Sequence, residues 1–409
     1  MEKSVNIHTL KNGIRVVHME DSLRVAYCGM LLNIGTRDEL EHEHGYAHFL
    51  EHLLFKGTSC YNALQIIDMA ESVGADLNAY TTKEEIFLYA GFLKENYERI
   101  FALISDLIFD SNFPEEGLKT EKEVVIDEIN SYKDTPSELI FDDFEDLVFD
   151  GCALGKNILG TQESLKKTTS KDILNFRNRL YSSDRMVFFS VGNIPFKRVV
   201  RMAEKYLENQ QIRKIGSQRI KPTSYIPKTV TIHKKTHQAH CVIGGRSFDL
   251  YDGRRQTAIL LNNLLGGPFM SSLLNLSLRE KHGLAYNVES SYSPYSDTGI
   301  WNIYFGTDCS DVDKCVSLIY KELNKLCRKE ISDARMTKLK RQIISQLLFS
   351  SENKENVALN LGKSILYYNQ FDSLEATIKE VEEITAKQIL EVANLLFDEK
   401  SFSTLIYNK

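Results

Sequence analysis

The chain has 409 residues, 43% hydrophobic and 26% charged, which is ordinary for a globular protein of about two domains. With 50 Lys and Arg against 56 Asp and Glu, the net charge is −6, which argues against a nucleic-acid-binding surface or an anionic membrane as partner. No apolar run approaches the roughly 18–20 residues that span a bilayer, and seven cysteines without a CxxC pair favour reduced thiols in a cytoplasmic protein.

In chain order, the N-terminus MEKSVNIHTLKNGIRVV alternates like a first strand and lacks the apolar core of a signal peptide. Alternation and β-branched content predict further strands, and apolar residues three and four apart predict helices. The predicted strands are 13–20, 24–34, 85–92, 229–235 and 299–307. The predicted helices are 64–73, 96–109, 115–133, 310–326 and 334–348.

The two halves of the chain follow the same course. Each closes with an amphipathic helix and a β-rich strand, and TTSKDILNFRNRLY (168–181) aligns with EITAKQILEVANLLF (383–397) with apolar positions in register. The polar, Pro-containing stretch between the halves suits an exposed connector. We therefore expect an α+β fold of two homologous mixed domains, each a mostly antiparallel sheet packed with helices. The predicted boundaries are 1–207, a linker at 208–228, and 229–409.

The segment HGYAHFLEHLLFKGT (44–58) places ionisable residues in an apolar helix. His48 and His52 are four apart and Glu51 is three after His48, so all three share one helix face. Two imidazoles one turn apart can grip zinc, and a glutamate beside them can act as general base. His44 extends the ladder by one turn, but Gly45 favours a helix that starts after it. Incidental, partly exposed histidines are the alternative, and a zinc site needs a third ligand.

The predicted helix at 115–133 supplies a candidate third ligand. Its apolar stripe contains Val125 and Ile129, and at 100° per residue Glu121 and Glu128 fall about 40° and 60° from Val125. Buried carboxylates need a cation or hydrogen-bond donors. Glu128 as zinc ligand, with Glu121 as its hydrogen-bonding support, would meet that need. Alternatively, one or both carboxylates lie at the edge of the stripe and reach water.

Three motifs in order, HFLEHLLFKGT, NAYTTKEEIFLYA and EKEVVIDEI, closely resemble the pitrilysin/insulinase and mitochondrial-processing-peptidase family of zinc peptidases. In that family the third zinc ligand is a glutamate about 75 residues after the second histidine, and Glu128 is 128 − 52 = 76 residues after His52. The resemblance covers the whole chain. It implies one Zn²⁺ per chain held by His48, His52 and Glu128, with Glu51 as the catalytic base and Glu121 behind the ligands.

The same resemblance assigns roles outside the H-x-x-E-H helix. The segment LREKHGLAY carries Arg279 and Tyr286, which in the family face the zinc across a chamber, orient substrate and donate to the oxyanion. Longer relatives hold four such domains in one chain and this chain holds two. The resemblance therefore implies a dimer in which Arg279 and Tyr286 serve the partner's zinc, with a homodimer as the simplest assembly and a heterodimer with a related subunit as the alternative.

The resemblance also indicates a substrate-side strand at NAYTTKEEIFLYA (78–90), where an extended peptide adds to a sheet edge through Asn78, Ala79, Tyr80 and Thr81. The expected function is zinc-dependent endopeptidase activity on peptides or unfolded leader segments inside a closed dimeric chamber. A non-catalytic partner subunit of a processing peptidase is the alternative, although the zinc motif is intact. One departure from the family, Cys152 in place of a loop histidine, implies only a change in local packing.

Overall fold

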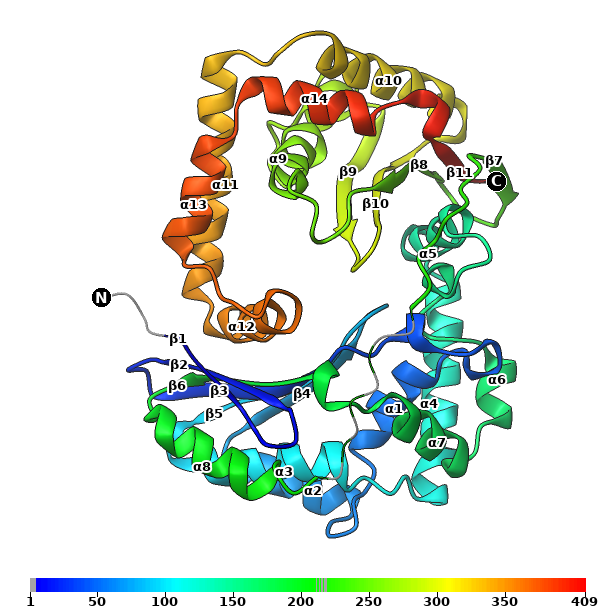
Figure 1. The fold of residues 1–409 in the computed structure, drawn as a ribbon. Coiled ribbons are helices and arrows are strands. Elements are labelled where there is room, and N and C mark those ends of the chain that lie inside the picture. The colour runs from blue at the N-terminus through cyan, green and yellow to red at the C-terminus, as the bar shows by residue number, and fades with distance from the viewer. Residues whose placement is uncertain (1–4, 211, 213, 215, 217–218) are drawn as a thin grey trace. The chain divides into compact units, whose positions relative to one another are not determined.

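The computed structural model describes residues 5–210, 212, 214, 216 and 219–409. The chain forms two compact units, each assembled from three segments of sequence (Figure 1). Unit 1 comprises Met1–Asn130, Lys156–Arg219 and Ser350–Asp372. Unit 2 comprises Ser131–Gly155, Ile220–Phe349 and Ser373–Lys409.

Unit 1 is built on a six-stranded sheet in the order β1-β2-β6-β3-β5-β4. Only the β2–β6 pair is parallel, and β4 lies at an edge, where it pairs with β5 alone. The strands are β1 (Val5–Thr9), β2 (Arg15–Glu20), β3 (Val25–Leu32), β4 (Asp76–Thr81), β5 (Ile86–Leu93) and β6 (Met186–Gly192).

Helices cover both faces of this sheet. Along β3, Met30 and Leu32 enter the core formed with α1 and α3, whereas Leu31 points to the opposite face, where α12 packs. Strands whose two faces are both buried are expected to be apolar throughout rather than alternating. The helices of unit 1 are α1 (Tyr46–Leu54), α2 (Ala63–Glu71), α3 (Tyr97–Phe109), α4 (Glu115–Lys133), α6 (Gln162–Lys167), α7 (Ser170–Leu180), α8 (Phe196–Tyr206) and α12 (Lys354–Tyr368).

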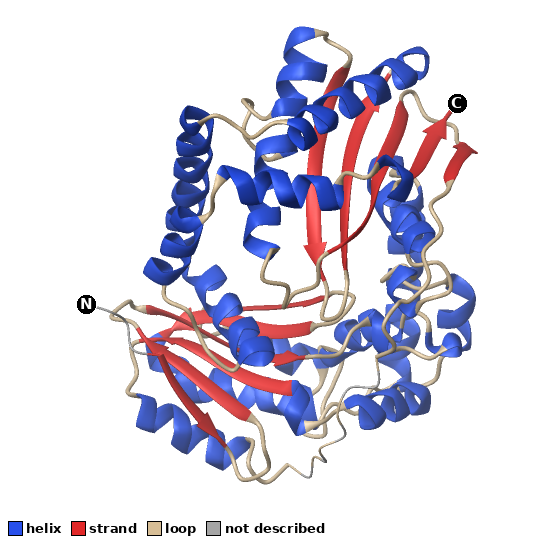
Figure 2. Ribbon diagram, turned by 45° about the horizontal axis from the view of Figure 1, so that its top comes forward, coloured by secondary structure: helices blue, strands red, loops and turns tan. Residues whose placement is uncertain are grey.

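Unit 2 contains a five-stranded sheet in the order β7-β11-β8-β10-β9, again with one parallel pair, β7–β11 (Figure 2). The strands are β7 (Thr229–His233), β8 (Ala239–Ser247), β9 (Ala285–Pro294), β10 (Gly299–Thr307) and β11 (Ser403–Asn408). The helices are α5 (Pro136–Val148), α9 (Arg255–Gly266), a π-helix at Asn275–Lys281, α10 (Val312–Arg328), α11 (Asp333–Glu352), α13 (Leu374–Glu383) and α14 (Ala386–Leu396).

The two sheets share one topology. Matching the parallel pair β2–β6 to β7–β11 brings β3, β5 and β4 onto β8, β10 and β9 in the same spatial order. This confirms the predicted fold class, an α+β duplication with mostly antiparallel sheets. The units also exchange a helix each: α12, from the second half of the sequence, packs on β3 and β6, and α5, from the first half, packs on β8 and β11.

The predicted strands and helices all occur, with ends shifted by a few residues. The exchange of α5 and α12 means that the compact units are discontinuous in sequence, so the boundaries 1–207 and 229–409 stay a prediction about the duplication. The predicted linker, 208–228, includes residues 211, 213, 215, 217 and 218, which lie outside the described residues.

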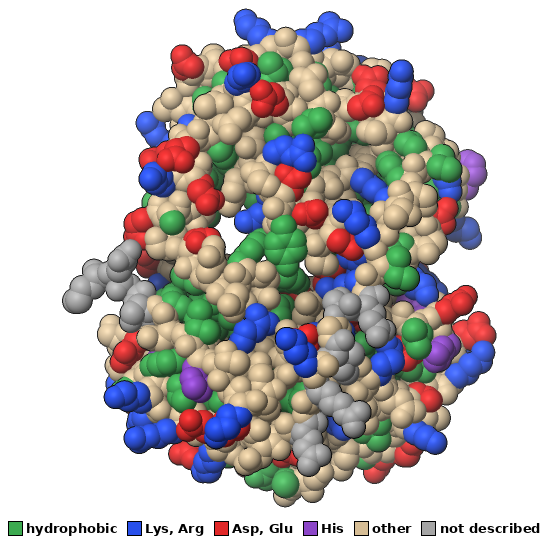
Figure 3. Space-filling view, in the orientation of Figure 1, with side chains coloured by type: hydrophobic (Ala, Val, Ile, Leu, Met, Phe, Trp, Pro, Cys, Tyr) green, Lys and Arg blue, Asp and Glu red, His purple; other side chains and the backbone are tan. Residues whose placement is uncertain are grey.

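The surface charges, the lengths of the helices and the cysteines of the structure fit the composition of the chain. On the face drawn in Figure 3, Lys and Arg side chains are interspersed with Asp and Glu side chains. Within the described part of the chain, every helix is too short or too polar to cross a bilayer. All seven cysteines are described and all are free thiols; Cys152 is partly buried against the apolar residues around α5.

Candidate metal centre

Helix α1 starts where the sequence predicts, directly after Gly45. Gly45 has φ 95°, a left-handed conformation that suits glycine, and a Cβ there would lie 2.8 Å from the Cα of Gly160. The backbone N–H groups of Gly45 and Ala47 donate to the buried carboxylate of Glu39 at 2.9 and 2.8 Å, which fixes the first turn. His44 lies before the helix, and its Nε2 is hydrogen-bonded to the Asn157 carbonyl oxygen at 2.9 Å.

His48 and His52 present their Nε2 atoms to one carboxylate on α4. The Glu128 Oε2 lies 3.8 Å from His48 Nε2 and 3.7 Å from His52 Nε2. Ligand atoms of these three residues all lie within 4.8 Å of one another, and no other such group of three occurs among the described residues. The structure therefore brings together the three residues predicted to hold zinc. His48 and His52 lie one turn apart on α1 and face Glu128 on α4.

The electrostatics of the two histidines differ. Burial, together with the nearby His52, lowers the pKa of His48 to about 3, so its imidazole is neutral near pH 7, the form that binds metals. Burial also lowers the pKa of His52. The hydrogen bond to Glu121 and the neighbouring carboxylates outweigh that effect, so the pKa of His52 lies above its ordinary value.

Glu121 lies behind His52, and its two carboxylate oxygens contact two different side chains. Its Oε2 accepts from His52 Nδ1 at 3.0 Å, and its Oε1 contacts Lys56 Nζ at 2.5 Å. Burial raises the pKa of Glu121, but these two hydrogen bonds more than offset it, so the pKa lies below the usual value. An ionised Glu121 fixes the His52 tautomer with the proton on Nδ1 and leaves Nε2 free to bind.

Glu51 projects from the same helix face and contacts a strand. Its Oε2 accepts a hydrogen bond from Thr81 Oγ1, at the end of β4, at 2.5 Å. Burial raises the pKa of Glu51, against the lowering effects of Thr81 and His52. A raised pKa makes the carboxylate a better proton acceptor at neutral pH, which is what a general base requires.

The donor set fits a zinc ion. A tetrahedral site with bonds of about 2.05 Å separates its ligand atoms by roughly 3.3 Å, so the imidazole–carboxylate distances of 3.7 and 3.8 Å are within about half an ångström of what zinc requires. Glu128 is 44% exposed and can make that adjustment. The Nδ1 of His48 is buried and has no hydrogen-bond partner in the described structure, so packing rather than a carboxylate orients this ring.

The predicted substrate-binding residues Asn78, Ala79, Tyr80 and Thr81 all lie on β4, one of the two edge strands of the sheet in unit 1. The stretch 78–90 is a hairpin rather than a single strand, since β4 turns at 82–85 into β5. Along β4, Ala79 packs toward the core that contains α1 and Tyr80 packs toward α12. Thr81 therefore joins the edge strand directly to Glu51.

Arg279 and Tyr286 are neighbours in unit 2. Arg279 lies in the π-helix and Tyr286 at the start of β9, and the Arg279 Cζ lies 5.7 Å from the centre of the Tyr286 ring. Tyr286 is 82% exposed. An exposed hydroxyl of this kind can donate to a ligand, and π-helical turns occur frequently at functional sites.

Sequence reasoning missed two contacts at this site. Thr81 was identified as part of a strand but not as a partner of Glu51, and Lys56 was not singled out although it contacts Glu121. Lys56 lies four residues after His52 but beyond the end of α1 at Leu54, so helical spacing gave no signal for it. The Thr81 contact depends on how β4 packs on α1, which residue spacing does not reveal.

Two sequence profiles and several relatives match this chain. A sequence profile described as "Insulinase (Peptidase family M16)" matches residues 15–162, and one described as "Peptidase M16 inactive domain" matches residues 167–343. An uncharacterized zinc protease of Bacillus subtilis is 32% identical over 400 residues, which are 98% of this chain and 97% of that protein. The mitochondrial-processing peptidase subunit beta of Neurospora crassa is 29% identical and covers 94% of this chain and 85% of its own.

Solved structures share the fold. The crystal structure of a protease from Helicobacter pylori has a TM-score of 0.90 at 22% identity and covers 100% of both chains. A crystal structure from Pseudomonas fluorescens, titled as a peptidase M16 inactive domain, has a TM-score of 0.92 at 18% identity and covers 99% of this chain and 97% of that one. The sequence profiles and the relatives that match along the full length show that this chain belongs to the insulinase family of peptidases, family M16.

Proposed function

We propose that the chain is a zinc-dependent endopeptidase that hydrolyses peptides or unfolded leader segments. The observation that carries the proposal is the convergence of His48 Nε2, His52 Nε2 and a Glu128 oxygen, with Glu51 on the same helix face. The relatives named zinc proteases support the choice of metal. His48, His52 and Glu128 would hold one ion per chain.

A bound zinc ion would supply Lewis-acid polarisation and lower the pKa of a water from 15.7 towards 7. The chain's own residues supply the rest of the chemistry. Glu51 takes the proton of the attacking water and passes it to the leaving amine, and Thr81 holds the Glu51 carboxylate in place. The ionised Glu121 keeps the proton of His52 on Nδ1.

The substrate would pair with β4. Because β4 is an edge strand, one side of its backbone is unpaired within the sheet and can accept an extended peptide through Asn78, Ala79, Tyr80 and Thr81. Main-chain pairing discriminates little between sequences. It therefore suits general peptide substrates or unfolded leaders.

Arg279 and Tyr286 would complete the active site of a partner chain within a closed homodimeric chamber. The exposure of Tyr286 and its proximity to Arg279 support a shared ligand-facing role, in which Tyr286 donates to the oxyanion and Arg279 orients the substrate. A heterodimer with a related subunit would use the same residues in the same way. The family includes mitochondrial-processing peptidase subunit beta, whose name denotes one subunit of an assembly.

The Glu51→Gln variant tests the proposal. The amide preserves shape but cannot accept the proton, so we expect zinc content to equal that of the wild type while kcat for a quenched peptide falls by about 10²–10⁴-fold. Zinc is measured by mass spectrometry and turnover by fluorescence, with and without chelator. A wild type that cuts no peptide when loaded with zinc would favour the non-catalytic subunit, and a variant that retains full turnover would refute Glu51 as the general base.

A further inference from the structure

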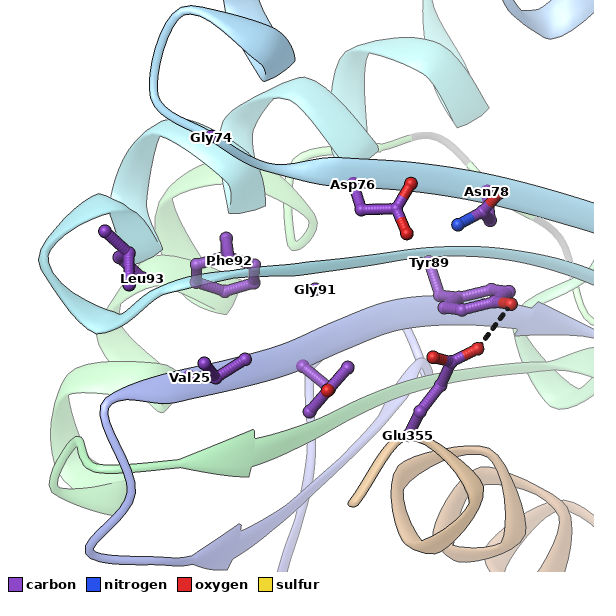
Figure 4. Close-up of a pocket in the computed structure, with 10 residues that line it drawn as sticks. Val25, Gly74, Asp76, Asn78, Tyr89, Gly91, Phe92, Leu93 and Glu355 are labelled. Carbon is purple, nitrogen blue, oxygen red and sulfur yellow. Dashed lines mark hydrogen bonds between the residues drawn. The ribbon is translucent and has the colours of Figure 1, made fainter. Parts of the chain in front are cut away.

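A pocket of about 190 Å³ opens on unit 1 beside β4, on the face of the sheet that α12 covers (Figure 4). This volume far exceeds the roughly 10–15 Å³ that one water requires. The pocket is lined by Val25, Tyr27, Gly74, Asp76, Asn78, Tyr89, Gly91, Phe92, Leu93 and Glu355. No residue in this set belongs to the metal centre.

The hollow follows from the register of three strands. Gly91 pairs with Tyr27 on one side and Asp76 on the other, and Tyr89 likewise lies between Gly29 and Asn78. Residues directly opposite in an antiparallel pair point to the same face. Because Gly91 has no side chain, the Tyr27 ring lies against its backbone, where a Cβ would be 2.9 Å from the ring. Tyr27, Asp76 and Tyr89 then line the same hollow.

The chemistry of the lining favours a cation. Asp76 on β4 and Glu355 in the first turn of α12 contribute two carboxylates, and the Tyr89 hydroxyl donates to Glu355 Oε1 at 2.8 Å. The ten described lining residues include no Lys, Arg or His. The rings of Tyr27 and Tyr89 add aromatic surface that attracts ammonium and guanidinium groups.

The lining suits an organic cation better than a metal ion. Of the described residues, only His48, His52 and Glu128 form a group of three whose ligand atoms converge as a metal requires, and the pocket contains none of them. The apolar side chains of Val25 and Leu93, which pair across β3 and β5, also line the pocket. They suit the methylene stem that carries a Lys or Arg charge.

We propose that this pocket binds a cationic group of the peptide substrate, either a Lys or Arg side chain or the N-terminal ammonium. The inference rests on the proposed function, because it requires a peptide paired with β4. Thr81 contacts Glu51, whereas Asp76 and Asn78 precede it by 81 − 76 = 5 and 81 − 78 = 3 residues on the same strand. A paired peptide would therefore place its cation about three to five residues from the cleaved bond.

Peptide binding to the Glu51→Gln variant tests the pocket without turnover. The probes are acetylated, fluorescent 12-residue peptides that carry one Lys, and matched peptides with norleucine in its place. We expect the Lys peptide to bind about tenfold more tightly, the worth of one charge-assisted hydrogen bond. Adding Asp76→Asn and Glu355→Gln should abolish this preference, and Asp76→Lys should reverse it toward peptides with Glu.

Cleavage by the wild type tests the register. With the single Lys moved along the peptide, kcat/KM should peak when Lys lies three to five residues from the cut bond, through KM rather than kcat. The variant Asp68→Asn/Glu71→Gln, on exposed positions of α2, removes the same charge and should leave the preference intact. An unacetylated peptide without Lys shows whether the N-terminal ammonium takes the place of Lys.

The proposal is overturned if Lys and norleucine peptides bind the Glu51→Gln variant equally, or if the Lys preference survives loss of both carboxylates. Asp76→Asn is isosteric and Glu355→Gln can still accept from Tyr89, and each is also tested singly, so that one folded variant suffices. A wild type that cuts no peptide would refute the proposed function alone. The binding comparison would still decide the pocket.

Discussion

The Glu121 carboxylate connects the metal centre to the scaffold through His52 and Lys56. His48 has no equivalent partner and depends on burial and on its ring contact with His52, whose centroid lies 4.6 Å away. The two ligands from α1 are therefore held by different means. Zinc binding through His52 should therefore be sensitive to substitution of Glu121, which is not itself a ligand.

We predict that Glu121→Gln weakens zinc binding by about 10–100-fold, the usual cost of removing a partner of a ligating histidine. The amide cannot hold the proton on His52 Nδ1 as firmly and leaves Lys56 without its counter-charge. Affinity is measured by competition with a coloured chelator. Glu123→Gln, at an exposed position of the same helix, is the control. Equal affinities for Glu121→Gln and wild type would refute the role of Glu121.

Spacing along one helix was sufficient to predict that His48, Glu51 and His52 share a face, because i, i+3 and i+4 positions lie on one side of any α-helix. Glu121 lies in the core, as its position around the helix predicts. Glu128 was expected on the core-facing side, but its side chain is 44% exposed and yet reaches both imidazoles. The position of a residue around a helix predicts the direction of its side chain. It does not predict how far the neighbouring helix covers that side chain.

The exchanged helix α12 completes the sheet of unit 1. Its buried Leu361 and Ile365 pack on the face that contains Leu31, Phe87 and Phe189, all fully buried. Arg15 on β2 also donates to the carbonyl oxygen of Ile365 at 2.6 Å. Without this helix the face would expose a contiguous apolar surface, which folded monomers avoid.

We predict that a fragment of residues 1–207 binds a hydrophobic dye and aggregates, because it lacks α12. The same fragment followed by a flexible linker and residues 350–372 should bind less dye and aggregate less, although α5 still exposes the apolar face that packs on β8 and β11 in the full chain. Dye fluorescence and size-exclusion chromatography measure the difference. A linker of equal length ending in a scrambled 350–372 segment is the control. A well-folded, dye-free 1–207 fragment would contradict the structural role of α12.

The predicted domain boundaries do not coincide with the compact units, because α5 and α12 are exchanged between the halves of the sequence. Local patterns identified many of the strands and helices, though not β8, β9, α5 or α12, because alternation and 3.6-residue periodicity are properties of short segments. Which sheet a helix covers depends on contacts between residues far apart in sequence. Helices α5 and α12 are ordinary amphipathic helices at their own positions, so their exchange could not be predicted from them.

For the whole molecule, the duplication separates the proposed chemistry into two halves. The metal centre belongs to unit 1, and Arg279 and Tyr286 belong to unit 2. If one chain's Tyr286 serves the partner's zinc, defects in different halves should complement each other when chains are mixed. Defects in the same half should not.

We predict that mixing Glu51→Gln with Tyr286→Phe chains restores about a quarter of wild-type activity. Random exchange makes half of the dimers mixed, and each mixed dimer has one intact site of two. Activity is measured after dissociation and reassociation. Mixing Glu51→Gln with His48→Ala is the control and should restore nothing, since both defects lie in unit 1. Failure of the first mixture to exceed the second would contradict a composite homodimeric site.

The central claim is that two imidazoles of α1 and one carboxylate of α4 bind the same ion. Anomalous diffraction from zinc-loaded crystals, recorded on both sides of the zinc absorption edge, tests this directly. We predict one peak per chain, about 2.0–2.2 Å from His48 Nε2, His52 Nε2 and a Glu128 oxygen. A peak at any other position, or zinc-loaded crystals without a peak between α1 and α4, would contradict the claim.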